Sequence, residues 1–82
     1  MNEFRWNQEK NLLLQVTRGI SFEEIVAAIE AGKLLDEVSH PSRPNQRIYV
    51  VEIEDYPWEV PYVVETDGAH FLKTAYPSRK RK

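Results

Sequence analysis

The spacing of hydrophobic positions changes near residue 33 from a helical to an extended period, which predicts two helices followed by strands. The clearest helix begins at a capping box, Ser21-Phe22-Glu23-Glu24, and ends at Gly32, which can adopt the left-handed conformation that stops a helix. Its apolar residues fall at i, i+3, i+4 and i+7 and are Phe22, Ile25, Val26 and Ile29. This single stripe predicts a helix that faces the core rather than a partner.

A first helix precedes it, and its apolar residues cover more than one face. Asn7 can cap a helix that runs from Gln8 to about Thr17, and Gly19 is its expected stop. The apolar residues are Leu12, Leu13, Leu14 and Val16. Such a broad apolar surface predicts that this helix is packed against the rest of the protein. Residues 4–6, before the helix, form a possible edge strand.

The second half of the chain has the alternation and the β-branched residues of strands. Residues 47–54 give the strongest strand signal, residues 58–65 and 69–76 follow it, and residues 34–38 form a possible short strand. Pro61 has no N–H for a ladder, so its strand is expected at a sheet edge or at a bulge. The prediction is one α+β domain over residues 1–82, with two N-terminal helices packed on a small antiparallel meander of three to four strands.

Composition narrows the class of protein. The 82 residues, 41% hydrophobic and 29% charged, are typical of one soluble globular domain. The absence of cysteine excludes disulfides and thiolate metal sites. There is no apolar leader and no run of the roughly 20 apolar residues that a membrane span needs. We therefore expect a cytoplasmic protein without a membrane partner.

Positive charge is concentrated at the C-terminus. Residues 1–78 hold seven Lys and Arg against thirteen Asp and Glu, a net charge of −6, whereas residues 79–82 add +4. This segment is either an anion-binding site at a strand end or a solvated tail.

No metal-ligand spacing and no glycine-rich phosphate loop is present, so no metal and no cofactor is expected. The candidate site residues are His40, Arg47, Lys73 and Arg79. If the three main strands pair as an antiparallel meander, Arg47 and the segment from Tyr76 to Arg79 fall at the same end of the sheet. Such a set could cleave RNA without a metal: a base takes the 2′-hydroxyl proton, a cation neutralises the phosphorane, and an acid protonates the leaving oxygen.

Each of these residues also has an ordinary structural interpretation. Arg79 suits the phosphate because its planar fork bonds two oxygens, and His40 suits the role of base or acid. Arg47 and Lys73, however, are better explained as surface charges beside strands, and His40 as an exposed residue of a Pro-flanked loop.

Two stretches resemble the BrnT-type toxins. At the N-terminus these are Phe4-x-Trp6-Asn7-x-x-Lys10 and Arg18-Gly19-Ile20-Ser21-Phe22-x-Glu24, and at the C-terminus residues 61–65 and 71–80. The resemblance implies a RelE/ParE-like fold and the toxin of a type II toxin–antitoxin pair. Such toxins are metal-independent ribonucleases that a small ribbon-helix-helix antitoxin neutralises. Lys73 and Arg79 match the two arginines of the family's last strand.

Two other functions stay open on the residues alone. One is a non-enzymatic interaction module, whose acidic body would bind a basic partner. The other is a nucleic-acid binder without catalysis.

Overall fold

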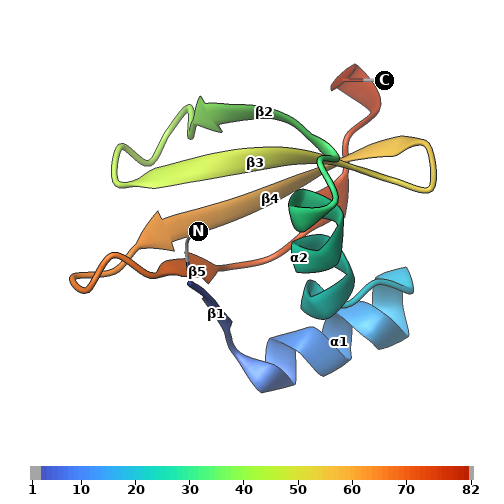
Figure 1. The fold of residues 1–82 in the computed structure, drawn as a ribbon, viewed down its shortest axis with the longest axis horizontal. Coiled ribbons are helices and arrows are strands. Elements are labelled where there is room, and N and C mark those ends of the chain that lie inside the picture. The colour runs from blue at the N-terminus through green and yellow to red at the C-terminus, as the bar shows by residue number, and fades with distance from the viewer. Residues whose placement is uncertain (1–2, 82) are drawn as a thin grey trace.

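The computed structural model of this protein, which describes residues 3–81, places two helices against one side of a curved sheet (Figure 1). The elements are β1 (Phe4–Trp6), α1 (Gln8–Arg18), α2 (Phe22–Glu30), β2 (Leu34–Ser39), β3 (Gln46–Ile53), β4 (Tyr56–Val64), β5 (His70–Leu72), β6 (Tyr76–Pro77) and the short 3-10 helix η1 (Arg79–Arg81).

Both helices begin and end at the residues that the sequence indicates. The Asn7 side chain accepts a hydrogen bond from the Lys10 amide, and Gly19 ends α1 with a φ of 67°. At α2 the Ser21 hydroxyl accepts from the Glu24 amide while the Glu24 carboxylate accepts from the Ser21 amide, so the predicted capping box is confirmed. These bonds satisfy amide groups that the first helical turn leaves without partners.

A buried asparagine joins the two helices. Asn11 is fully buried in α1, and its side-chain oxygen accepts from the backbone amide of Phe22 at 2.7 Å. Its side-chain nitrogen donates to the Glu23 carboxylate, also at 2.7 Å. Because a buried amide without partners would destabilise the fold, these two bonds fix the angle at which α2 leaves α1.

The hydrophobic core lies between α2 and the sheet. Phe22 and Ile25 are completely buried, and Val26 and Ile29 pack against the same core, so the predicted core-facing stripe is confirmed. From the sheet and the adjoining chain, the core receives Tyr49, Val51, Val60, Tyr62, Leu72 and Ala75.

The prediction for α1 is wrong. Of its four apolar residues only Leu14 is buried, whereas Leu12, Leu13 and Val16 are 55%, 51% and 85% exposed. Only one side of α1 contacts the core, so neighbouring leucines on the helix cannot all be covered. Within residues 3–81, no helix is both long enough and apolar enough to cross a membrane.

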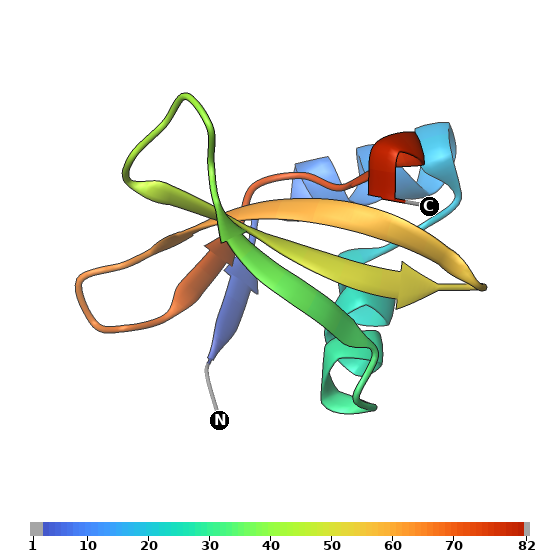
Figure 2. The same cartoon turned by 90° about the horizontal axis from the view of Figure 1, so that it is seen from above.

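The α+β character holds, but the antiparallel meander of three to four strands is wrong. The described residues form a mixed six-stranded sheet with the order β1-β5-β4-β3-β2, and β6 also pairs with β4. β1 lies beside β5 (Figure 2) and runs parallel to it, with Phe4 opposite His70 in the register. Arg5 on β1 secures this pairing through ion pairs of 2.8 Å to Glu65 and 2.6 Å to Asp67, beside the turn between β4 and β5.

The expectation for Pro61 is also wrong, because β4 is a central strand. β3 pairs with one side of β4 over its whole length, while β5 and β6 share the other side. The carbonyl of Pro61 accepts from the Lys73 amide in the gap between β5 and β6. A residue's N–H and C=O point to the same side of a strand, so the missing N–H of Pro61 faces this break in the neighbouring strands.

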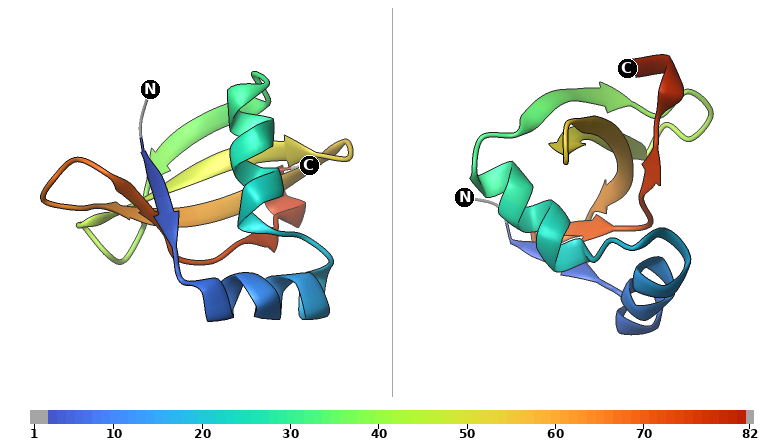
Figure 3. Two further views of the ribbon diagram at one scale, coloured as in Figure 1. Left: turned by 60° about the horizontal axis from the view of Figure 1, so that its bottom comes forward. Right: turned by 90° about the vertical axis from the view of Figure 1, so that its right-hand side faces the viewer.

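The two faces of the sheet have different coverings. We call the face that carries Tyr49, Val51, Val60 and Tyr62 the helix-side face, because these residues belong to the same core cluster as Phe22 and Ile25 of α2. The opposite face, which we call the outer face, carries residues at the alternate positions, among them Ile48 and Glu59. In the C-terminal segment, residues 76–81, Tyr76 and Pro77 lie in the sheet as β6 beside β4, and the chain after them turns over the outer face, where Ser78 and Arg81 donate to Glu59. Residues 78–81 and α2 therefore lie on opposite sides of the strands (Figure 3).

Candidate functional site

The structure separates the two arginines that were expected to meet. Arg47 lies at the start of β3, whereas Arg79 borders a surface depression of about 340 Å³ together with Ile53, Tyr56 and Trp58, at the other end of that strand. Arg47 and Ile53 are six residue steps apart on an extended strand, a distance of about 20 Å. The expectation that Arg79 points across the strand ends toward Arg47 is therefore wrong.

The other two predicted residues lie elsewhere again. The Lys73 ammonium sits 5.2 Å from the centre of the Phe71 ring, a cation–π distance, and Lys73 is exposed. His40 lines a pocket on the outer face, while Arg47 belongs to the helix-side face. The four residues thus do not form one site, and the catalytic roles of His40, Lys73 and Arg79 stay predictions.

Arg47 instead belongs to a group of polar and aromatic side chains that four strands bring together at the end of the sheet away from α2 (Figure 1). We call it the polar cluster. It consists of Glu37 from β2, Arg47 and Tyr49 from β3, Tyr62 from β4 and His70 from β5.

Tyr49 and Tyr62 fix the imidazole of His70. The Tyr49 hydroxyl lies 2.5 Å from Nδ1 of His70, a short hydrogen bond. The Tyr62 ring stacks on both neighbours, with ring centres 4.1 Å from Tyr49 and 4.7 Å from His70. Phe4 of β1 closes the group edge-on, 6.1 Å from His70. A half-buried histidine held on three sides in this way has one ring orientation.

The same tyrosine connects this histidine to the charged members of the cluster. The Tyr62 hydroxyl donates to the Glu37 carboxylate, and Arg47 lies 4.0 Å from the other oxygen of Glu37. Burial, followed by the hydrogen bond to Glu37, raises the pKa of Tyr62 above its usual range, although a hydrogen bond from Arg47 opposes this shift. Tyr62 therefore stays protonated at neutral pH and remains a donor to Glu37.

The cluster has the parts of an acid–base site for an anionic substrate. When Tyr49 accepts from Nδ1–H of His70, the second ring nitrogen, Nε2, carries the lone pair of a base. The Arg47 side chain is 45% exposed and the Glu37 side chain 38% exposed, so an anion in solvent can reach the guanidinium. Within residues 3–81, His, Asp and Glu side chains do not converge in groups of three or more that could hold a metal ion.

Residues 14–77 match the protein family described as a domain of unknown function, DUF4258. The chain belongs to the DUF4258 family. All five residues of the polar cluster lie within the matched range of this DUF4258 protein, and Arg79 lies beyond it. No curated protein and no solved structure matches the chain.

Of the polar cluster of this DUF4258 protein, only Arg47 is a site residue that the sequence predicts. Arg47 and Tyr49 alternate on one strand face, and this signal is visible in the sequence. The partners Glu37, Tyr62 and His70 depend on the register of three strand pairs, with Glu37 opposite Tyr49, Arg47 opposite Tyr62, and His70 opposite Val64. That register is a property of the folded sheet.

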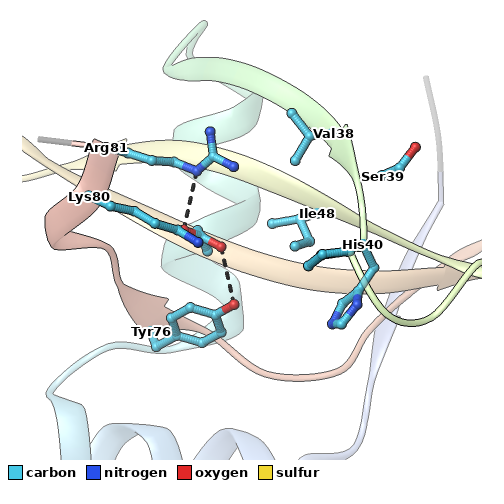
Figure 4. A pocket seen from close by; sticks show the side chains of 9 residues that line it. Val38, Ser39, His40, Ile48, Tyr76, Lys80 and Arg81 are labelled. Carbon is cyan, nitrogen blue, oxygen red and sulfur yellow. Dashed lines mark hydrogen bonds and ion pairs between the residues drawn. The ribbon is translucent and has the colours of Figure 1, made fainter.

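The basic C-terminus of this DUF4258 protein is not a free tail over its described part. Glu59 on the outer face is 2% exposed and accepts hydrogen bonds from Ser78 at 2.5 Å, Tyr76 at 3.2 Å and Arg81 at 3.2 Å (Figure 4). Burial raises the pKa of the Glu59 carboxyl, but these three donors together outweigh burial and hold the pKa below its ordinary value. Arg81 is thus anchored and does not belong to a solvated tail, while Lys82 lies outside the described residues.

Proposed function

We propose that this DUF4258 protein is the toxin of a type II toxin–antitoxin pair and cleaves RNA without a metal, with the polar cluster as the reacting site. Two observations support the proposal. The sequence resembles BrnT-type toxins at both ends, and the cluster combines a fixed histidine with an accessible arginine. The observation that carries it is the 2.5 Å hydrogen bond between Tyr49 and His70. The Tyr62 ring stacks on this histidine, and the Tyr62 hydroxyl donates to Glu37, the carboxylate that Arg47 also approaches.

The proposed reaction uses the 2′-hydroxyl of the RNA as nucleophile. Nε2 of His70 takes the 2′-hydroxyl proton as the 2′-oxygen attacks the adjacent phosphorus. The guanidinium of Arg47 binds the phosphate oxygens and neutralises the charge that builds on them. The bond from phosphorus to the 5′-oxygen breaks, and this oxygen takes a proton from water. The products carry a 2′,3′-cyclic phosphate and a 5′-hydroxyl.

Glu37, Tyr49 and Tyr62 act as positioning residues in this scheme. Tyr49 holds the imidazole through Nδ1, and the Glu37 carboxylate stands between the Tyr62 hydroxyl and Arg47. Buried tyrosines that are already hydrogen-bonded do not need to move when substrate binds. Such preorganisation lowers the barrier for charge development.

The proposal includes a partner and a location. A small ribbon-helix-helix antitoxin would neutralise the toxin, and the exposed Leu12, Leu13 and Val16 of α1 offer an apolar surface for it. The substrate would be mRNA, which places the protein in the cytoplasm.

Cleavage of a defined RNA by the purified protein in the presence of EDTA tests the proposal. We expect wild type to produce fragments with 5′-hydroxyl ends, mapped by primer extension. His70→Gln, which keeps a hydrogen-bonding side chain, is expected to lower the rate about 10²- to 10⁴-fold. Arg47→Ala is expected to lower it about 10²- to 10³-fold.

Arg43→Ala is the matched control for Arg47→Ala. Arg43 is an exposed arginine in the loop before β3, and it lies outside the polar cluster. Its loss should leave cleavage at the wild-type rate. The proposal fails if wild type does not cleave, or if His40→Gln or Arg79→Ala abolishes cleavage while His70→Gln remains fully active.

A non-enzymatic interaction module is the second candidate, and the exposed apolar residues of α1 favour it. In that case expression of the wild type without a partner should not inhibit growth. Replacing Leu13 and Val16 by lysine should then abolish binding to the protein encoded by the neighbouring reading frame. Neither the wild type nor this variant should cleave RNA.

A further inference from the structure

The outer face carries a pocket of about 380 Å³ that the proposed reaction does not use (Figure 4). It lies between the end of β2 and the C-terminal segment, over Ile48 of β3 and Glu59 of β4. Lys80 and Arg81 reach into it from one side, and His40 stands on the other. Its volume falls within the range of small-molecule sites.

The polar groups around this pocket are arranged to donate hydrogen bonds. The backbone amide of Ser42 donates to Nδ1 of His40 at 3.2 Å, so the proton of a neutral His40 ring resides on Nε2. His40 in this state is a donor and has no free lone pair for base chemistry. The ammonium of Lys80 and the guanidinium of Arg81 are donors as well. The set therefore favours binding of an anion over acid–base catalysis.

Glu59 does not repel such an anion strongly, because its charge is already compensated. Its carboxylate accepts from Ser78, Tyr76 and Arg81. Arg81 uses its Nε for this bond, which leaves the N–H groups of its terminal nitrogens for a ligand. Glu59 thereby fixes the direction of Arg81 and of the Tyr76 ring.

The rest of the lining is apolar and aromatic. Val38, Pro41 and Ile48 form one wall, and the half-buried Tyr76 ring lies on the side of the C-terminal segment. A bare inorganic anion would gain nothing from these surfaces. A planar heterocycle that carries a phosphate would use both parts of the pocket, since nucleic-acid bases stack favourably on aromatic side chains.

We propose that the outer pocket binds a nucleoside monophosphate unit, either as a free mononucleotide or as the phosphorylated end of an RNA strand. Its phosphate contacts Lys80, Arg81 and the Nε2–H of His40, and its base lies against Tyr76 and the wall formed by Val38 and Ile48. The site lies on the opposite face of the sheet from the polar cluster. It therefore does not depend on the proposed ribonuclease function.

Titration of the ¹⁵N-labelled full chain with UMP and AMP, followed by NMR and calorimetry, tests the proposal. Amide shifts are expected to concentrate at Val38, Ile48 and Tyr76. Uridine lacks the phosphate and inorganic phosphate lacks the nucleoside. Each is expected to bind at least about tenfold more weakly than UMP, which is a difference in binding free energy of about 1.4 kcal/mol.

Lys80→Gln removes one phosphate contact without touching the Glu59 hydrogen bonds, and it should weaken UMP binding about tenfold or more. Lys33→Gln is the matched control, because Lys33 is an exposed lysine outside the pocket. It should bind UMP like wild type. An unchanged amide spectrum away from the pocket shows that both variants are folded.

Short oligonucleotides distinguish the two sources of the ligand. Tighter binding of a dinucleotide with a terminal phosphate than of UMP identifies an RNA end, and binding of UMP alone identifies a free mononucleotide. The proposal is overturned if UMP does not shift the pocket residues at millimolar concentration, if uridine binds as well as UMP, or if Lys80→Gln binds UMP like wild type. Equal binding of oligonucleotides with hydroxyl ends, mapped elsewhere on the surface, also overturns it.

Discussion

Replacing Glu59 by glutamine should weaken the attachment of the C-terminal segment to β4 while keeping the volume of the side chain. Glu59 is 2% exposed, and one of its oxygens accepts from both Ser78 and Arg81 while the other accepts from Tyr76. In the glutamine variant the remaining oxygen can still accept from one hydroxyl, but the amide nitrogen is itself a donor.

The expected loss follows from these contacts. The Ser78 hydroxyl can rotate to accept from the new amide, so a bond worth about 1.5–3 kcal/mol becomes a neutral one worth about 0.5–1.5 kcal/mol. The guanidinium of Arg81 carries only donors, so it cannot accept from the new amide and loses its bond to residue 59. Its side chain is 30% exposed, however, and regains hydrogen bonds to water. We expect the free energy of unfolding to fall by about 2–3 kcal/mol, a large part of the about 5–15 kcal/mol typical of a small domain.

The effect should depend on pH in a defined direction. The pKa of Glu59 is lower in the folded protein than in the unfolded chain, so its contribution is present above the unfolded pKa, about 4.3, and is lost as pH falls through the folded pKa. The difference between wild type and Glu59→Gln should therefore be full at neutral pH and shrink progressively below about pH 4.

Urea denaturation measures this difference, with tryptophan fluorescence as the probe because Trp58 lies opposite Pro77 in the β4–β6 pair. Ser78→Ala, which removes one donor and leaves the carboxylate, should lose only about 1–2 kcal/mol. Equal midpoints for wild type and Glu59→Gln at neutral pH, or a difference that is the same at acid pH, would refute the reasoning.

Three further outcomes are expected. Ile25→Ala should lose about 2–5 kcal/mol in chemical denaturation because Ile25 is completely buried, whereas Leu13→Ala on the exposed side of α1 should change stability by less than about 0.5 kcal/mol. Asn11→Ala should lose about 2–4 kcal/mol because it strands the buried Phe22 amide, against about 1 kcal/mol for the exposed cap in Asn7→Ala; equal losses would contradict this account. The proposed antitoxin is expected to be basic, because residues 1–78 carry a net charge of −6, and it should then associate faster at low salt in stopped-flow measurements; rates independent of ionic strength would exclude electrostatic steering.

The helices of this protein were determined locally, and the sequence was sufficient to predict them. Their starts at Asn7 and Ser21 and the stop at Gly19 depend on contacts within four residues, so the sequence contains the whole cause. The buried stripe of α2 was also predictable, because one helical period and one core face leave a single arrangement. Residues 47–54 and 58–65 were recognisable as strands from their β-branched and aromatic residues, whereas the single strand predicted over residues 69–76 is wrong, because the structure divides it into β5 and β6.

What only the tertiary structure decided is which segments lie side by side. The parallel pairing of β1 with β5 joins the two ends of the chain, and the break between β5 and β6 opposite Pro61 allows β4 to be central. The burial of Leu14 but not of Leu13 depends on where α1 lies relative to the core. No local pattern encodes these choices, because they follow from the total apolar area that the packed chain can cover.

The candidate site shows the same division. Arg47 and Tyr49 could be placed on one face from alternation alone. His70 reaches Tyr49 only because β5 pairs with β4 in one register, and Glu37 lies beside Tyr49 only because β2 pairs with β3. A shift of one residue in either pair would turn these side chains to the other face. The residue types were therefore visible in the sequence, whereas their convergence is a consequence of long-range strand pairing.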